Sequence, residues 1–193
     1  MNIVRGGPDG NERLTAATGA VLFVLLAAEG VTILSIRQLL APHVFIGMLL
    51  IPPVALKLAS TGWRFMRYYR GASEYRRKGP PLLPLRLLAP VSVVSTVALF
   101  ATGVALVVLG PSGGIVLGLH KASFVVWLVA TGIHVLAYLP RLPRMLAGDW
   151  RPGTRLAGVG GRRLLVAGAI VAGAILAVAT LGSGHAWTHV LDG

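Results

Sequence analysis

Residues 116–139 read VLGLHKASFVVWLVATGIHVLAYL. A helix of about twenty apolar residues crosses the hydrocarbon core of a bilayer, so this stretch predicts a transmembrane helix. Runs of the same kind lie at 14–38, 41–60, 88–109 and 163–182. We therefore predict an all-α integral membrane bundle of five helices, with residues 1–193 forming a single transmembrane domain.

The composition excludes several classes of protein. Hydrophobic residues make up 55% of the 193 residues and charged residues 12%, which is not the composition of a water-soluble domain. The chain contains no cysteine, which rules out disulfides, zinc or iron–sulfur sites with cysteine ligands, and covalently attached c-type haem. Any redox cofactor must therefore be held by other ligands.

The basic residues predict an orientation. The net charge is +12, and most of the Lys and Arg residues lie before the first run and in two segments, 61–86 and 140–162. Because cytoplasmic loops are enriched in these residues, both segments are expected to be cytoplasmic, with the N-terminus inside and the C-terminus outside. Sorted in this way, the charge does not support nucleic-acid binding. Arg outnumbers Lys fifteen to three, a bias typical of GC-rich bacteria, so we expect a multi-pass protein of the bacterial cytoplasmic membrane.

Two connections between the runs are short and rich in turn residues. Ala41-Pro42 opens the second run, and GPSGG at 110–114 separates the third run from the fourth. The first and second helices, and likewise the third and fourth, are therefore expected to be antiparallel neighbours.

Three histidines, His43, His120 and His134, lie inside apolar runs, where an ionisable side chain indicates a functional site. His120 and His134 are fourteen residues apart, which is about 21 Å along a helix and within about 40° of a whole number of turns. His43 opens the second helix as His120 opens the fourth. In the predicted orientation these two helices run in the same direction, so His43 and His120 should face each other near the outer surface.

A neutral imidazole from each of two helices suits the axial coordination of a b-type haem in a protein without cysteine. Fourteen residues after His43 stands Lys57, which this spacing places opposite His134 near the inner surface. The sequence thus predicts two pairs of nitrogen ligands at two depths. The alternative for His43 and His120 is a buried, hydrogen-bonded pair, and for His134 a proton relay or a quinone contact.

This pattern resembles the two-haem framework of membrane cytochromes b, including the quinol-oxidising and ferric-reductase-like families, in which two helices each carry His-x13-His. His43, His120 and His134 stand where the framework has ligands, and Gly47 stands where it has a small residue that makes room for the porphyrin. Lys57 replaces the fourth histidine. The resemblance implies two haems b if Lys57 is an axial ligand of iron, and one if Lys57 instead extends its ammonium to the cytoplasmic interface.

Charged residues near the two levels are candidates for contacts with haem propionates. Arg37 and Lys121 lie at the outer level, and Arg64 and Arg67 lie at the inner level. Each of them also has the position of an ordinary interfacial residue at a helix end.

Glu29 is the acidic residue of the first run, in its outer half. It is either a proton acceptor beside a quinol, or a carboxyl that is kept neutral or paired with Arg37. His185 and His189 are four residues apart on the predicted outer tail, which is a weak metal-binding pattern without further ligands.

We therefore expect a b-type cytochrome that carries electrons across the membrane between two haems. Its expected partners are quinone or quinol and an extracytoplasmic redox protein or small oxidant, and it would be a quinone-linked oxidoreductase or the cytochrome subunit of one. The alternative is a haem-free transporter or scaffold that uses His134, Lys57 and Glu29 as ionisable groups in the membrane.

Overall fold

The computed structural model describes residues 6–79, 83–110, 114–141, 143 and 156–184, and the elements in these ranges are helices joined by turns. Within the described ranges five helices are long and apolar enough to cross a membrane, which confirms the predicted all-α transmembrane bundle. They are α1 (Gly7–Leu34), α2 (Leu40–Tyr69), α4 (Leu83–Leu109), α5 (Gly114–Tyr138) and α7 (Val159–Ala179). The short helices are α3 (Ser73–Arg77), η2 (Leu139–Arg141) and η3 (Leu181–Gly184).

The helix boundaries follow local chemistry. Gly6 and Gly158 precede α1 and α7 with φ of 107° and 83°, left-handed conformations that glycine adopts at little cost. Pro42 lies in the first turn of α2, where its missing N–H has no intrahelical partner to lose.

The end of α2 corrects the sequence prediction. The segment 61–86 was predicted to be a basic loop, but α2 continues to Tyr69 and α3 follows directly. No glycine or proline interrupts residues 63–70, and the first residue that leaves the right-handed region is Gly71, with φ of 86°. The first run also differs from its predicted range of 14–38, since α1 begins at Gly7 and ends at Leu34.

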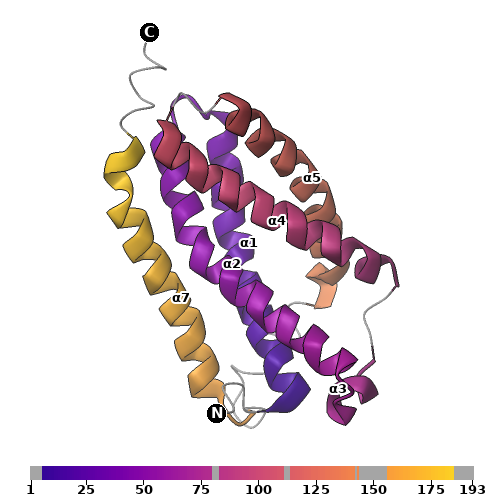
Figure 1. The fold of residues 1–193 in the computed structure, drawn as a ribbon. Helices are drawn as coiled ribbons and strands as arrows, with labels where there is room; N and C mark the ends of the chain where they lie inside the picture. The colour runs from indigo at the N-terminus through magenta and orange to yellow at the C-terminus, as the bar shows by residue number, and fades with distance from the viewer. Residues whose placement is uncertain (1–5, 80–82, 111–113, 142, 144–155, 185–193) are drawn as a thin grey trace.

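The helices form two groups (Figure 1). In the first group α2 packs against α1 on one side and α7 on another, and in the second group α4 packs along α5. The two groups meet mainly where α4 crosses α2. The antiparallel α1–α2 and α4–α5 pairs are therefore as predicted.

Gly173 allows the close contact between α7 and α2. A Cβ atom at this position would lie 2.2 Å from the carbonyl oxygen of Leu49, a distance that no side chain can occupy. Leu50 and Ala177, each 1% exposed, are buried in the same group.

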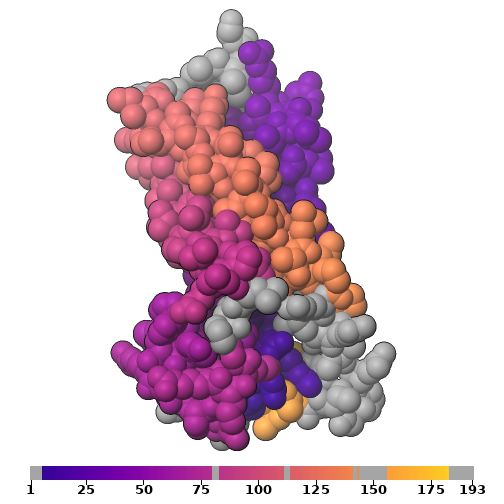
Figure 2. Space-filling model, turned by 90° about the vertical axis from the view of Figure 1, so that its right-hand side faces the viewer, coloured from indigo at the N-terminus to yellow at the C-terminus, as the bar shows by residue number. Residues whose placement is uncertain are grey.

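The α5 helix lies on the outside of the molecule beside α4, where Figure 2 shows it running across the surface. Most of its large apolar side chains are exposed, among them Ile115, Val125 and Leu136. Because a lipid environment accepts such a surface, the exposure agrees with a multi-pass membrane protein in a bilayer.

We call the end of the bundle with the α1–α2 and α4–α5 connections the outer end, and the end with α3 the inner end. The names follow the orientation predicted from the charges, and the orientation itself stays a prediction.

Candidate functional site

His43 on α2 and His120 on α5 face each other at the outer end. Their ring centres are 6.4 Å apart and the ring planes are inclined by 86°. The two helices both start at this end and run in the same direction (Figure 1). The prediction that these two histidines lie at one depth and face each other is confirmed.

The Nδ1 atom of His43 lies against α1. It is 2.9 Å from Glu29 Oε1 and 3.0 Å from Thr32 Oγ1. Thr32 donates its own hydroxyl proton to the carbonyl oxygen of Glu29, 2.5 Å away, so its oxygen is left to accept the Nδ1–H of His43. Glu29 therefore pairs with His43 and not with Arg37, which is exposed.

The Nδ1 atom of His120 lies against α4 in a matching arrangement. It is 3.1 Å from the carbonyl oxygen of Leu99 and 3.1 Å from Thr102 Oγ1, and Thr102 donates to the carbonyl of Ala98 at 2.7 Å. A carbonyl oxygen can only accept, so the Nδ1 of His120 must carry the proton. A Cβ atom at Gly103 would lie 3.2 Å from His120 Cε1, so this glycine makes room for the ring.

These contacts assign the tautomer of both rings. With the proton on Nδ1, the lone pair of each ring is on Nε2. Within the described ranges the structure gives no hydrogen bond to Nε2 of His43 or of His120. A histidine that binds a metal through one nitrogen usually donates the other N–H to a carboxylate or a backbone carbonyl, and both rings show this pattern.

Sequence reasoning missed Thr32, Thr102, Gly103 and the carbonyl of Leu99. A signal for two of them exists in the hairpins. Thr32 and His43 lie at nearly the same distance in sequence from the middle of the α1–α2 connection, with a difference of one residue, and the same holds for Thr102 and His120 about the α4–α5 connection. In an antiparallel pair, such residues lie at one level.

Gly47 lies next to this cluster. A Cβ atom there would be 3.6 Å from Glu29 Oε1, an ordinary van der Waals contact. The glycine thus borders the carboxylate on α1, and its predicted role beside a porphyrin stays a prediction.

At the inner end, Lys57 turns toward α1. Its Nζ donates a hydrogen bond to the carbonyl oxygen of Thr15 at 2.7 Å, and a Cβ atom at Gly19 would lie 3.0 Å from Nζ. Ser60 and Asn11 continue this polar contact between α1 and α2, because Thr15 Oγ1 donates to Ser60 Oγ at 3.0 Å and Asn11 Nδ2 donates to the Ser60 carbonyl at 3.1 Å.

His134 lies on α5, one helical turn before Tyr138. Its Nδ1 is buried and has no hydrogen-bond partner among the described residues, and its ring centre lies 4.9 Å from that of Tyr138. The predicted pairing of Lys57 with His134 stays a prediction, and Lys57 has a backbone acceptor on α1.

The other predicted residues lie at the edges. Lys121 and Arg37 are exposed at the outer end, and Arg64 is half-buried at the inner end. The guanidinium of Arg67 lies 5.8 Å from the ring centres of Trp63 and of Tyr75. His185 and His189 lie outside the described residues.

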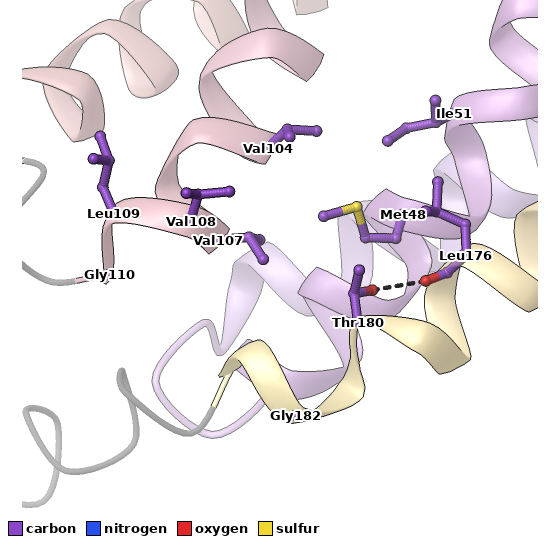
Figure 3. A pocket seen from close by; sticks show the side chains of 10 residues that line it. All are labelled: Met48, Ile51, Val104, Val107, Val108, Leu109, Gly110, Leu176, Thr180 and Gly182. Carbon is purple, nitrogen blue, oxygen red and sulfur yellow. Dashed lines mark hydrogen bonds between the residues drawn. The ribbon is translucent and has the colours of Figure 1, made fainter.

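An apolar cavity of about 850 Å³ lies between α2, α4 and α7, near the outer end (Figure 3). It is lined by ten residues, in chain order Met48, Ile51, Val104, Val107, Val108, Leu109, Gly110, Leu176, Thr180 and Gly182. The hydroxyl of Thr180 is used within α7, where it donates to the carbonyl of Leu176 at 2.9 Å. Met48 follows Gly47 and Val104 follows Gly103 in the sequence, and neither histidine lines the cavity.

The donor set limits which metal group this site suits. Within the part of the chain that the structure describes, no group of three or more His, Asp, Glu or Cys residues could hold a metal ion. The two facing imidazoles are too few ligands for a bare metal ion. They suit a metal group that brings further ligands of its own. No protein-family model, curated protein or solved structure gives a significant match to the chain.

Proposed function

We propose that this protein is a membrane cytochrome b whose outer haem b is held by His43 and His120. The observation that carries the proposal is the facing pair of imidazoles, both with the proton on Nδ1 and the lone pair on Nε2. This arrangement requires that α2 is aligned with α1 and α5 with α4, so that each Nδ1 meets its acceptor while the two rings face each other. Two buried histidines that are close by chance would not need an Nδ1 acceptor on both sides.

The distance between the rings supports the fit. Metal–imidazole bonds are about 2.0 Å long, so two rings that bind one metal from opposite sides have centres about 6 Å apart once the ring radii are included. The observed 6.4 Å agrees with this separation.

When bound, the haem iron supplies one-electron redox chemistry, and the protein supplies ligation, burial and electrostatics. In this chain His43 and His120 would hold the group. Glu29 and Thr32 orient His43 from α1, and Thr102 with the Leu99 carbonyl orients His120 from α4. Gly103 leaves the space that the His120 ring occupies.

A second haem between Lys57 and His134 is the alternative to a single haem. It requires Lys57 to leave its acceptor at Thr15, since a lysine ligand must offer a lone pair and not a donated proton. The buried Nδ1 of His134, without a partner in the described ranges, is the observation that favours a ligand at this level.

The lipid bilayer is the environment of the five apolar helices. Quinone or quinol is the mobile partner that we propose, together with an extracytoplasmic redox protein or small oxidant. The apolar cavity between α2, α4 and α7 supports the quinone, because its volume of about 850 Å³ and its aliphatic lining suit a lipid-soluble molecule. We place the protein in a bacterial cytoplasmic membrane on the charge and composition of the sequence. There it would act as a quinone-linked oxidoreductase or as the cytochrome subunit of one.

The test is a reduced-minus-oxidised spectrum with pyridine haemochrome quantification on purified wild type, His120→Ala and Lys57→Ala. One haem in the wild type, none in His120→Ala and one in Lys57→Ala is the expected result. Two haems in the wild type, falling to one in Lys57→Ala, would establish the inner site. A folded wild-type protein without haem absorbance after haem reconstitution would overturn the proposal and favour a haem-free transporter or scaffold.

A further inference from the structure

The two candidate ligands of the outer haem are not held by equivalent groups. Each Nδ1 lies within 3.1 Å of a threonine hydroxyl, on Thr32 for His43 and on Thr102 for His120. The second acceptor differs. For His120 it is the neutral backbone carbonyl of Leu99, and for His43 it is the carboxyl group of Glu29 at 2.9 Å.

The carboxyl group of Glu29 is unusual in its surroundings. Its side chain is 13% exposed, and its second oxygen, Oε2, is buried without a hydrogen-bond partner in the described part of the chain. Burying a charged group costs much free energy unless an opposite charge compensates it. The chain places no lysine or arginine against this carboxylate among the described ion pairs. The partner of this carboxyl group is therefore the ring of His43, and a metal bound at Nε2 of that ring would make its Nδ1–H a stronger donor to the carboxylate.

We infer that Glu29 is a positioning residue that tunes the outer haem through His43, making this one axial imidazole the stronger electron donor and favouring the ferric state. The inference rests on the proposed function, because it needs a haem on His43. It concerns the equilibrium between the ferric and ferrous states and assigns no proton transfer to Glu29.

The sign follows from electrostatics. A carboxylate that accepts the Nδ1–H increases the basicity of the imidazole, and hydrogen-bonded partners of this kind tune metal sites. The ferric centre carries one more positive charge than the ferrous centre, so a nearby negative charge stabilises it more, and the low dielectric of the membrane interior strengthens the effect. Removal of the charge should favour the ferrous state and raise the midpoint potential.

Orientation is the second contribution. Glu29 and Thr32 fix the ring of His43 from α1, so that Nε2 is directed away from α1. Gly47 lies beside the carboxyl group, where a Cβ atom would be in ordinary van der Waals contact with Glu29 Oε1 at 3.6 Å.

The experiment is a potentiometric titration of haem-loaded protein with wild type, Glu29→Gln, Glu29→Asp and Glu12→Gln. Glutamine keeps the length of the side chain and can still accept from Nδ1, but it carries no charge. Aspartate keeps the charge and lengthens its distance to His43. Glu12→Gln makes the same chemical change on α1 near its inner end, where Glu12 pairs with Lys78, and serves as the matched control. The low-spin ferric EPR signal, which depends on axial donor strength, is the second readout.

We expect Glu29→Gln to increase the ferrous-to-ferric ratio at a fixed potential about tenfold. For a one-electron couple this corresponds to a midpoint potential about 59 mV higher. In Glu29→Asp the midpoint potential should rise by a smaller amount. The ferric EPR signal should shift in both Glu29 variants. In Glu12→Gln neither the midpoint potential nor the EPR signal should change. Haem retained in Glu29→Gln with an unaltered potential and EPR signal would overturn the inference and leave the haem assignment standing. If Glu29→Gln loses haem, the midpoint potential of Glu29→Asp is used instead. A higher potential supports the inference, and an unaltered potential and EPR signal overturn it. A wild type without haem would instead overturn the proposed function itself.

Discussion

The outer and inner ends of the bundle place ionisable side chains on the same two helices, α2 and α5, but hold them differently. At the outer end, His43 and His120 each have acceptors for Nδ1 on the neighbouring helix of their own hairpin, and their rings face each other with centres 6.4 Å apart. At the inner end, Lys57 donates to Thr15 on α1, and His134 Nδ1 has no partner in the ranges that the structure describes.

This difference concerns preorganisation. A ligand whose second nitrogen is already bound is held in one orientation before the metal group arrives, which lowers the entropy cost of binding. The outer pair meets this condition on both sides. The inner pair meets it on neither, since Lys57 has to give up a hydrogen bond and His134 has none to orient it.

The largest expected effect comes from removing a ligand. His43→Ala or His120→Ala should reduce haem from about one per chain to near none, a loss greater than the roughly 10–100-fold that an outer-shell partner contributes. His134→Ala and Lys57→Ala serve as the inner counterparts and should retain the haem. The measurement is haem per chain from the haemochrome spectrum. Haem that persists in His120→Ala would remove the distinction between the two ends.

Gly103→Ala tests whether the outer site depends on close packing. The new Cβ would lie 3.2 Å from His120 Cε1, so the ring must shift against the Leu99 carbonyl and Thr102. An overpacking cost of about 1 kcal/mol corresponds to a roughly fivefold weaker haem affinity. Gly118→Ala on α5 is the control, because a Cβ there meets nothing within 4 Å. Equal affinities in the two variants, measured by haem titration, would contradict the packing argument.

Gly19→Ala makes the corresponding change at the inner end, where the Cβ would lie 3.0 Å from Lys57 Nζ. Here the neighbour is the tip of a flexible side chain, which can move away, and the cost should stay below about 1 kcal/mol because alanine favours the helix. We expect a change of a few degrees or less in the thermal midpoint, with haem content unaltered. Gly30→Ala, with open space around its Cβ, is the reference. A loss of haem in Gly19→Ala alone would indicate that Lys57 is a ligand after all.

The smallest expected effect lies outside the membrane, where Lys78 beyond α3 pairs with Asp9 and Glu12 of α1. Partial burial alone would lower the pKa of Lys78, but hydrogen bonds and the charges of the two carboxylates raise it above its ordinary value of 10.5. A raised pKa in the folded state means that the stabilisation is complete at neutral pH and is lost as the pH rises above about 10.5. Because Asp9 is 65% exposed, solvent screening limits the contribution to about 0.5 kcal/mol.

The check is the thermal midpoint between about pH 9 and pH 12 in wild type and Lys78→Arg, since arginine keeps its charge over this range. The wild type should lose slightly more stability than Lys78→Arg as the pH rises. Parallel curves for the two proteins would show that the pair contributes nothing.

The sequence alone predicts the five spans, because the length of an apolar run is a property of the chain. It also predicts that His43 and His120 lie at one level, because depth along a helix follows from counting residues at 1.5 Å each. It also identifies Glu29 and Lys57 as ionisable groups within apolar runs. It cannot predict where α2 ends, since Trp63, Phe65 and Tyr69 continue a helix as readily as they mark a membrane interface.

Only the tertiary structure decides the partner of each side chain. That Glu29 meets His43, that Leu99 offers its carbonyl to His120, and that Lys57 turns to Thr15 all depend on how the helices are rotated about their axes. Close packing limits this rotation, as where Gly103 of α4 meets the His120 ring of α5 and Gly19 of α1 meets the Lys57 side chain of α2. Residue counting gives the level of a side chain, and helix packing gives the direction in which it points.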